Sequence, residues 1–220
     1  MIDPKQAQLS LIKKRYSLDR FNVVHSIPRH TLADNLAKVL DPNELRGKTV
    51  LEIGAGCSLY LPLFLELGVN QLIANDLLEK RLKLNNISDP RYVGIAGDFL
   101  ETDLPDSEVD VIFSNMTFMF LLPLFEEMFR KVRKILKPGG ILVTIDPNYV
   151  CPISWYRYLA ERSRANPDPA RPFSPFQFAK IAQANGLTVE RLVPFTSNHT
   201  WSTGHWLLGT CFGMRAVKSQ

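Results

Sequence analysis

Closely spaced glycines and a carboxylate form the first group of residues whose types indicate ligand chemistry. Gly54 and Gly56 follow a short apolar run, and their lack of a side chain permits a sharp turn with open space above the next helix. The free amide groups and positive dipole end of that helix favour an anionic ligand group, such as a carboxylate or a phosphate. Glu52, two residues before Gly54, adds a negative charge that suits an ammonium group better than a diphosphate.

Two aspartates follow later apolar runs and predict that the ligand contains a nucleoside. Asp76 lies 22 residues after Gly54, where an acidic side chain can accept hydrogen bonds from both hydroxyls of a ribose. Asp98 can accept a hydrogen bond from an exocyclic amine such as that of adenine, and Phe99 offers a ring beside the base. A dinucleotide fingerprint would require glycine at position 59, where the chain has Leu59, so binding of a pyrophosphate is disfavoured.

A parallel sheet would bring these residues to one edge, because ligands of such sheets bind at the carboxyl ends of the strands. Short apolar runs typical of buried parallel strands occur at 49–53, 71–74, 92–96, 109–113 and 141–145. Helical patterns follow at 59–67, in the charged stretch up to 86, at about 118–136 and at 175–185. Two closing runs, 187–195 and roughly 205–217, leave no room for a crossover helix and predict an antiparallel pair at the sheet edge.

Length and composition predict one globular domain. The chain has 220 residues, 45% hydrophobic and 22% charged, so it can bury a large core, and the disordered, collagen-like and disulfide-scaffold classes are excluded. Its three cysteines lie far apart without a CxxC pair, which argues against a thiolate metal site and favours a reducing compartment. Neither a leader-like start nor an uncharged apolar run of roughly eighteen residues is found. We therefore expect an unprocessed, soluble, cytoplasmic protein.

Positive charge is concentrated in the C-terminal part of the chain. The net charge is +4, and residues from 151 onward contain eight Lys or Arg against three acidic residues. Such an imbalance can attract an anionic substrate or a nucleic acid backbone. A solvated basic face is the simpler interpretation, because no basic run carries interleaved aromatics. A nucleic acid partner is therefore not expected.

Five motifs in register carry a family resemblance that spans residues 48–146. They are the segment 50–56, Asp76, the segment 97–99, the pair 104–105 ahead of 109–112, and the segment 136–140. Together they resemble the class I S-adenosylmethionine-dependent methyltransferases, in particular the small-molecule, type 11 group. The resemblance implies an α/β, Rossmann-like three-layer sandwich, whose seven-stranded, mostly parallel sheet ends in a C-terminal antiparallel hairpin. It also implies S-adenosyl-L-methionine as the cofactor.

The resemblance assigns the cofactor contacts. The loop from Glu52 to Gly56 would hold the methionine part, Asp76 the ribose, and Asp98 with Phe99 the adenine. The full expected set is Glu52, Gly54, Ala55, Gly56, Asp76, Leu77, Asp98, Phe99 and Asn115. Two departures stand out: Ser58 replaces a third glycine of many members, and the segment 114–118 is not the Asn/Asp-Pro-Pro-Tyr box of many amino-nitrogen methylating enzymes.

The chemistry of methyl transfer decides which further residues to expect. Transfer from a sulfonium is a direct displacement, so alignment is the main task, and a nitrogen or sulfur acceptor needs no base. A hydroxyl acceptor requires a base to remove its proton. The preferred candidates are Asp146, which equally suits a turn cap before proline, and His30, although a lone histidine is more often a surface or core residue. The histidines have no metal-ligand spacing with a third partner, so no metal is expected.

We expect a single domain, 1–220, with four parts. These are an N-terminal helical cap (1–46), a cofactor-binding core (47–146), an acceptor-covering insertion (147–175) and a last helix with a strand pair (176–220). Arginines and aromatics of the insertion suit a small-molecule or glycan acceptor, or pack as an amphipathic helix. The leading hypothesis is methylation of a small-molecule or saccharide hydroxyl. A nicotinamide-dependent oxidoreductase and a non-catalytic nucleoside-binding module on the same fold are the alternatives, and the sequence leaves the oligomeric state open.

Overall fold

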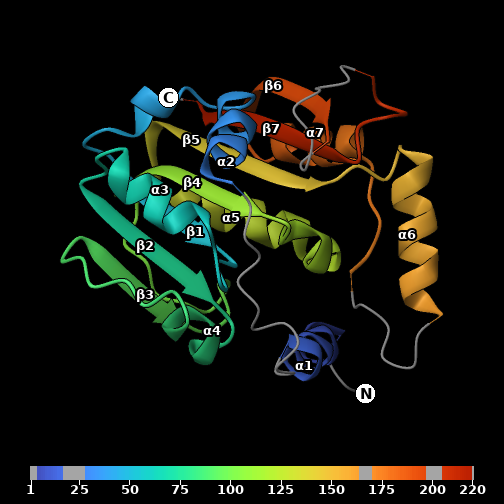
Figure 1. Ribbon diagram of the computed structural model, residues 1–220, viewed down its shortest axis with the longest axis horizontal. Helices are drawn as coiled ribbons and strands as arrows, with labels where there is room; N and C mark the ends of the chain where they lie inside the picture. The colour runs from blue at the N-terminus through green and yellow to red at the C-terminus, as the bar shows by residue number, and fades with distance from the viewer. Residues whose placement is uncertain (1–3, 17–27, 164–169, 197–204, 220) are drawn as a thin grey trace.

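The centre of the structure, a computed structural model, is a seven-stranded sheet (Figure 1). Residues 4–16, 28–163, 170–196 and 205–219 are described. The strands are β1 (Thr49–Ile53), β2 (Gln71–Asp76), β3 (Tyr92–Ala96), β4 (Val109–Asn115), β5 (Leu136–Pro147), β6 (Leu187–Phe195) and β7 (Cys211–Lys218). Their order is β3-β2-β1-β4-β5-β7-β6, and β7 runs antiparallel to β5 and β6 while the other neighbouring pairs are parallel. The predicted Rossmann-like α/β class with a C-terminal antiparallel hairpin is confirmed.

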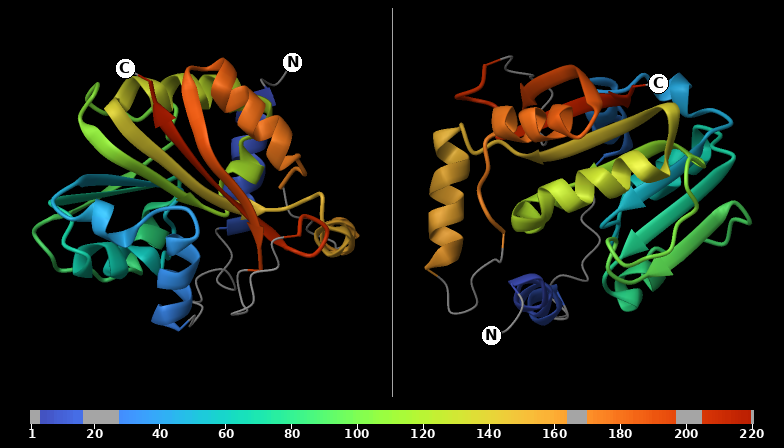
Figure 2. Two further views of the ribbon diagram at one scale, coloured as in Figure 1. Left: turned by 90° about the horizontal axis from the view of Figure 1, so that it is seen from above. Right: turned by 180° about the vertical axis from the view of Figure 1, so that it is seen from behind.

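Helices cover both faces of the sheet (Figure 2). They are α1 (Pro4–Tyr16), α2 (Arg29–Ala37), α3 (Tyr60–Glu66), α4 (Glu79–Lys83), α5 (Phe125–Ile135), α6 (Pro152–Arg162) and α7 (Pro175–Ala184), with short 3-10 helices η2 (Pro42–Leu45), η3 (Phe118–Phe120) and η4 (Leu122–Leu124). One apolar cluster packs α2, α3 and α4 against one face, and a second packs α5 and α7 against the other. Helices α1 and α6 instead lie beyond the carboxyl ends of the parallel strands (Figure 1).

Burial along the central strands takes polar side chains out of water. In β1 the residues from Val50 to Ile53 are buried, and in β2 those from Leu72 to Asp76, as expected for strands covered on both faces. Glu52, Asn75 and Asp76 are therefore buried polar residues in otherwise apolar strands. Burial of a charge costs free energy unless it is paired, so these positions indicate a site.

The structure corrects three element boundaries. The expected helix at 118–136 is wrong as one element: it is divided into η3, η4 and α5, because proline at position 123 lacks an amide hydrogen and suits only the first turn of a helix. The segment 137–140 lies inside β5, which starts at Leu136 and has a register shift against β4. The last strand begins at Cys211, since residues 206–208 form a turn.

Candidate active site

One cavity of about 1,100 Å³ lies at the carboxyl ends of β1, β2, β4 and β5. Its lining includes most of the expected cofactor contacts, namely Glu52, Gly54, Ala55, Asp76, Leu77, Asp98, Phe99 and Asn115. Gly56 does not line it, nor do Asp146 and His30. The volume of the cavity lies at the upper end of the roughly 300–1,000 Å³ that is typical of ligand sites.

The turn after β1 is shaped by close contacts. Gly54 and Gly56 have φ of +67° and +50°. A Cβ atom on Gly54 would lie 2.3 Å from Thr117 Oγ1, and one on Gly56 would lie 2.7 Å from the Arg81 guanidinium carbon. The Ala55 amide donates to the Asn75 carbonyl oxygen at 2.9 Å, so it is engaged within the fold. At Gly54 the Thr117 side chain requires glycine as well as the backbone conformation does, whereas at Gly56 the requirement comes from the positive φ, because the end of the Arg81 side chain could move.

Glu52 is the most deeply buried carboxylate at the cavity. Its side chain comes from β1 and the residue is only 1% exposed. Burial raises the pKa of Glu52 to about 8, the nearby Asp76 carboxylate acts in the same direction, and a hydrogen bond from Ser58 opposes them. Glu52 Oε2 accepts no hydrogen bond from any described residue. A cationic ligand group beside it would favour its ionised form.

Asp76 ends β2 next to an arginine that the sequence did not single out. Its Oδ1 accepts a hydrogen bond from the Leu78 amide at 2.9 Å, and its Oδ2 lies 4.0 Å from Arg81 Nη1. Burial raises the pKa of Asp76, while Arg81 and the backbone amides of Leu78 and Gly56 act in the opposite direction. Arg81 also lies over the Tyr16 ring, with its guanidinium carbon 5.0 Å from the centroid.

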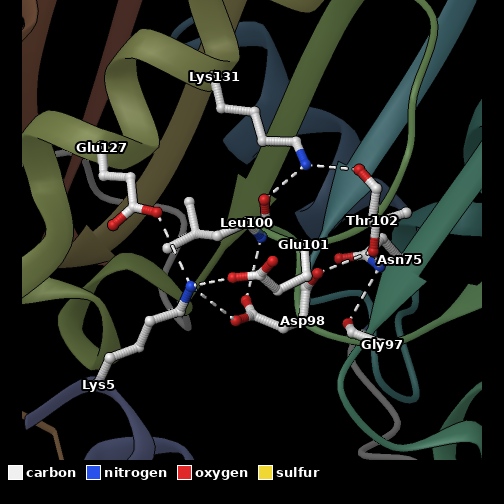
Figure 3. A network of polar contacts seen from close by, with 9 residues as sticks. All are labelled: Lys5, Asn75, Gly97, Asp98, Leu100, Glu101, Thr102, Glu127 and Lys131. Carbon is white, nitrogen blue, oxygen red and sulfur yellow. Dashed lines mark hydrogen bonds and ion pairs between the residues drawn. The ribbon is translucent and has the colours of Figure 1, made fainter. Parts of the chain in front are cut away.

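Asp98 is paired with a lysine from the first helix (Figure 3). Asp98 Oδ1 accepts a hydrogen bond from the Leu100 amide at 3.0 Å, and Lys5 Nζ lies 3.5 Å from Oδ2. The same ammonium bonds Glu101 at 2.5 Å and lies 3.8 Å from Glu127. The hydrogen bond to Glu101 is the main cause that raises the pKa of Lys5. Asp98 Oδ2 is buried and, among the described residues, receives this ion pair but no hydrogen bond.

The loop that carries Asp98 and Phe99 is fixed from two further elements (Figure 3). Lys131 of α5 donates to the carbonyl oxygens of Leu100 and Thr102 at 2.9 and 2.5 Å, and its Nζ lies 5.3 Å from the centroid of the Phe99 ring. Asn75 of β2 donates to the Gly97 carbonyl oxygen at 3.2 Å. Burial lowers the pKa of Lys131. The loop therefore presents its ring and carboxylate to the cavity from a fixed backbone.

The segment after β4 reaches the cavity in a strained conformation. Asn115, Met116 and Thr117 all line the cavity. Met116 has φ of +56°, which is uncommon for a residue with a side chain, and its amide donates to the Ile145 carbonyl oxygen at 2.7 Å. Strained residues of this kind cluster at functional sites.

Asp146 of β5 accepts hydrogen bonds from the chain that follows segment 115–117. It is fully buried and accepts hydrogen bonds from the Thr144 hydroxyl and, at 3.1 Å, from the Phe118 amide. The backbone amides of Thr117 and Met119 also favour the ionised form of this carboxylate by hydrogen bonding. Burial raises the pKa of Asp146 to about 7 against these hydrogen bonds. Its carboxylate caps the turn into η3, 28 positions away in the sequence, rather than a local turn before the proline that follows it, since Asp146 lies within β5.

Neither of the two histidines in the described ranges lines the cavity. His30 is exposed on α2 and does not line it, although its neighbours Thr31 and Leu32 do. His205 is exposed. His25 and His199 lie outside the described residues. Across the described part of the chain, no group of three or more His, Cys, Asp or Glu side chains is suited to hold a metal ion.

Helix α1 forms a roof that the sequence analysis did not predict in detail. Leu9, Ile12 and Tyr16 line the cavity, and with Lys5 they follow the spacing i, i+4, i+7 and i+11 of one helix face. Gln8 donates to the Phe120 carbonyl oxygen at 3.1 Å. The sequence of α1, PKQAQLSLIKKRY, has no marked apolar face, so nothing in the sequence showed that this side of the helix would pack across a site.

Helix α6 forms the wall opposite the cofactor residues. Ser154, Arg157, Tyr158 and Glu161 line the cavity together with Tyr149. Arg15 Nη2 of α1 donates to Glu161 Oε2 at 3.0 Å, which joins the roof to this wall. None of the helices in the described ranges is long and apolar enough to cross a membrane.

Comparisons with known proteins agree with this architecture. Residues 51–144 match the family model Methyltransf_11, described as a methyltransferase domain. No match was found among curated protein sequences. The structures similar to this chain include a putative S-adenosylmethionine-dependent methyltransferase from Listeria monocytogenes (13% identity, TM-score 0.67, covering 87% of this chain and 100% of that one).

A second similar structure is phosphoethanolamine N-methyltransferase 2 from Haemonchus contortus in complex with S-adenosyl-L-methionine (15% identity, TM-score 0.72, covering 97% of this chain and 60% of that one). A third is an S-adenosylmethionine-dependent methyltransferase from Aquifex aeolicus (23% identity, TM-score 0.58, covering 88% of this chain and 99% of that one). At these identities the likeness concerns the fold.

Proposed function

We propose that this chain, which is an S-adenosylmethionine-dependent methyltransferase with a type 11 domain, methylates a hydroxyl of a small molecule or saccharide. The observation that carries the proposal is that one and the same cavity is lined on one side by Glu52, Asp76 and Asp98 and on the other by Tyr149 and α6. Cofactor and acceptor would therefore meet in one space, at the strained segment 115–117.

The chemistry of the cofactor side fits an adenosyl sulfonium with an amino acid tail. Glu52 Oε2 and Asp98 Oδ2 are buried acceptors without a hydrogen-bond donor among the described residues, and the cofactor carries an ammonium and an adenine amine. S-adenosyl-L-methionine, when bound, supplies an electrophilic methyl group on sulfur. We assign the methionine part to Glu52 and the loop at Gly54 to Gly56, the ribose to Asp76 and Leu77, and the adenine to Asp98 and Phe99.

The residues of this chain would align the acceptor with the cofactor and exclude water from the cavity. The roof residues of α1 cover the cavity, and the capped segment after β4 lies between its two sides, so these residues can align an acceptor. Alignment of this kind is worth about 7–11 kcal/mol in intramolecular models. The proton of a hydroxyl acceptor would pass to a base in the lining, and Glu161 is the carboxylate of the acceptor wall that could accept it. Asp146 would act as a positioning residue, because its carboxylate is buried under the segment and does not line the cavity.

The acceptor wall supports a compact, polar acceptor with a flat face. Tyr149 and Tyr158 pack edge to face with ring centroids 5.9 Å apart, and both line the cavity. Asn35, Arg157 and Thr210 add hydrogen-bonding groups to the lining. Aromatic surface with a few polar groups is typical of small-molecule sites. Because the segment 114–118 is not an amine-type box, we propose a hydroxyl as the acceptor atom.

The division of the chain is part of the proposal. We assign acceptor coverage to the cap 1–46 and the insertion 147–175 of a single domain, 1–220, on the evidence of their described parts at the cavity. The core 47–146 would bind the cofactor, and 176–220 would complete the fold. The free cysteines Cys57, Cys151 and Cys211 support a cytoplasmic location.

Titration calorimetry and an acceptor panel test the proposal. Asp76→Ala should weaken binding of S-adenosylmethionine strongly, whereas Asp103→Ala, an exposed aspartate outside the cavity, should leave it unchanged. Matched hydroxyl, amine and thiol compounds are then scored by formation of S-adenosylhomocysteine, with hydroxyls expected to react. Reaction of amines alone would overturn the acceptor assignment, and cofactor binding without any transfer would favour the non-catalytic nucleoside-binding module.

A further inference from the structure

Helix α6 presents apolar side chains to solvent. Tyr156 and Leu159 are 74% and 59% exposed, and Ile153 and Trp155 are also exposed. At 3.6 residues per turn these four side chains share one half of the helix surface. Ser154, on the other half, is buried and donates to the Thr210 carbonyl oxygen at 3.0 Å. Exposed apolar patches of this kind mark interaction sites.

The turn before β7 also carries exposed apolar side chains, Leu207 and Leu208, and the hydrogen bond between Ser154 and Thr210 places that turn beside the first turn of α6, at the half that carries Ser154. The α6 apolar surface is therefore defined here by four residues of the helix alone: Ile153, Trp155, Tyr156 and Leu159.

Cationic side chains border the α6 apolar surface. Arg157 and Arg162 are exposed and flank the apolar half of the helix on its two sides. Glu161, the acidic residue of α6, is directed to Arg15 at the cavity wall.

We propose that the α6 apolar surface binds a lipid bilayer with anionic headgroups. Tryptophan, tyrosine and aliphatic side chains bordered by arginine are the composition of helices that lie in a membrane interface, and the positive charge complements anionic lipid. The helix has 11 residues, about 16 Å, so it would lie along the surface rather than cross it. The proposal goes beyond the proposed function and does not depend on the acceptor.

This placement has a geometric consequence for the cavity. The opposite half of α6 carries Ser154 and Tyr158, which line the cavity. A bound bilayer would therefore be separated from the acceptor wall by the thickness of one helix, about 10 Å.

Vesicle flotation with the full chain tests the proposal. Protein should float with phosphatidylcholine vesicles that contain phosphatidylglycerol, float less with phosphatidylcholine alone, and be released by salt. Leu159→Ser should lower partitioning about tenfold, since the leucine side chain would otherwise be buried in lipid. Arg162→Gln should lower it about fivefold.

Matched variants keep the test specific. Leu84→Ser removes another exposed leucine, 42% exposed, and Arg130→Gln removes another exposed arginine; both should partition like the unchanged protein. Circular dichroism and cofactor affinity verify folding of each variant. Failure to float with anionic vesicles, or equal losses for Leu159→Ser and Leu84→Ser, would overturn the proposal. So would a dimer that Leu159→Ser dissociates in protein that does not bind vesicles, because the surface would then join two copies of the chain.

Discussion

Lys5 Nζ lies 3.5 Å from Asp98 Oδ2, so a residue near the start of the chain is paired with the carboxylate expected to recognise adenine. Lys5 is only 12% exposed and also meets Glu101 and Glu127, which makes this pair different from an exposed ion pair of little energetic value. The pair ties the roof helix α1 to the loop after β3. Closure of the roof and the charge at Asp98 are thereby linked.

The Lys5 contact predicts an effect on cofactor affinity. Lys5→Ala should weaken binding of S-adenosylmethionine by about tenfold, because α1 loses a tether and three carboxylates are left near one another. Calorimetry measures the change. Lys13→Ala, an exposed lysine of the same helix, is the control and should bind normally. Equal affinities for the two variants would show that the pair has no part in binding.

Glu52 predicts a dependence of cofactor affinity on pH. Because burial raises the pKa of Glu52 to about 8, the ionised form, which attracts the cofactor's ammonium, increases as pH rises from 6 to 9. Binding should strengthen over this range in the unchanged protein. Glu52→Gln should bind weakly and lose this part of the pH dependence. The difference between the two profiles, measured by calorimetry, isolates Glu52 from the titration of the cofactor itself.

The same carboxyl predicts how stability changes with pH. The folded pKa of Glu52, about 8, lies above its model value of 4.5, so its favourable contribution is complete below pH 4.5 and is lost as pH rises through 8. Urea unfolding of the ligand-free protein should show Glu52→Gln gaining stability over the unchanged chain between pH 5 and 8. A constant difference across that range would contradict the raised pKa.

Substitutions of Asp146 should change stability more than the rate of methyl transfer. Asp146→Ala should lower the free energy of unfolding by about 2–3 kcal/mol, because the buried Phe118 amide and Thr144 hydroxyl lose their acceptor. Asp146→Asn keeps an acceptor oxygen and should retain most of the methyl transfer rate. A loss of about 10²–10⁴-fold in kcat by Asp146→Asn, with normal stability, would instead identify a general base.

Substitution of Gly54 by alanine should have a steric effect. The same substitution at Gly47, which has a similar φ but no close neighbour among the described residues, separates that effect from backbone strain. Gly54→Ala and Gly47→Ala place alanine at similar positive φ, +67° and +70°. Only at Gly54 would the new Cβ meet Thr117; nothing lies within 4 Å at Gly47. Gly47→Ala should cost about 1–2 kcal/mol of stability without changing cofactor affinity. Gly54→Ala should cost more and abolish binding, as measured by urea unfolding and calorimetry.

Elements with strong local patterns were predictable from the sequence. The apolar runs before Gly54, Asp76 and Asp98 predicted three parallel strands, and the rule that ligands bind at strand ends placed their polar residues together. The lining of the cavity contains all three. The short connection before the last strand predicted the antiparallel hairpin, and the family resemblance implied seven mostly parallel strands; both are present.

Contacts between distant segments were not predictable. Lys5 and Arg81 approach Asp98 and Asp76 only through tertiary packing, and no spacing in the sequence signals either pair. The burial of Asp146 depends on how η3 folds over it, which no local pattern of β5 contains. The break of the expected long helix into three pieces depends on one proline and this cap.

The position of Lys5 also bears on how the protein is produced. A fusion partner joined ahead of α1 would emerge beside the ion pairs that hold the roof, close to the mouth of the cavity. Lys218, near the other end of the chain, donates to the Leu136 carbonyl oxygen at the start of β5. This contact lies at the amino ends of the parallel strands, away from the cavity at their carboxyl ends (Figure 1). An affinity tag therefore belongs at the carboxyl terminus, where it leaves the entrance for ligands clear.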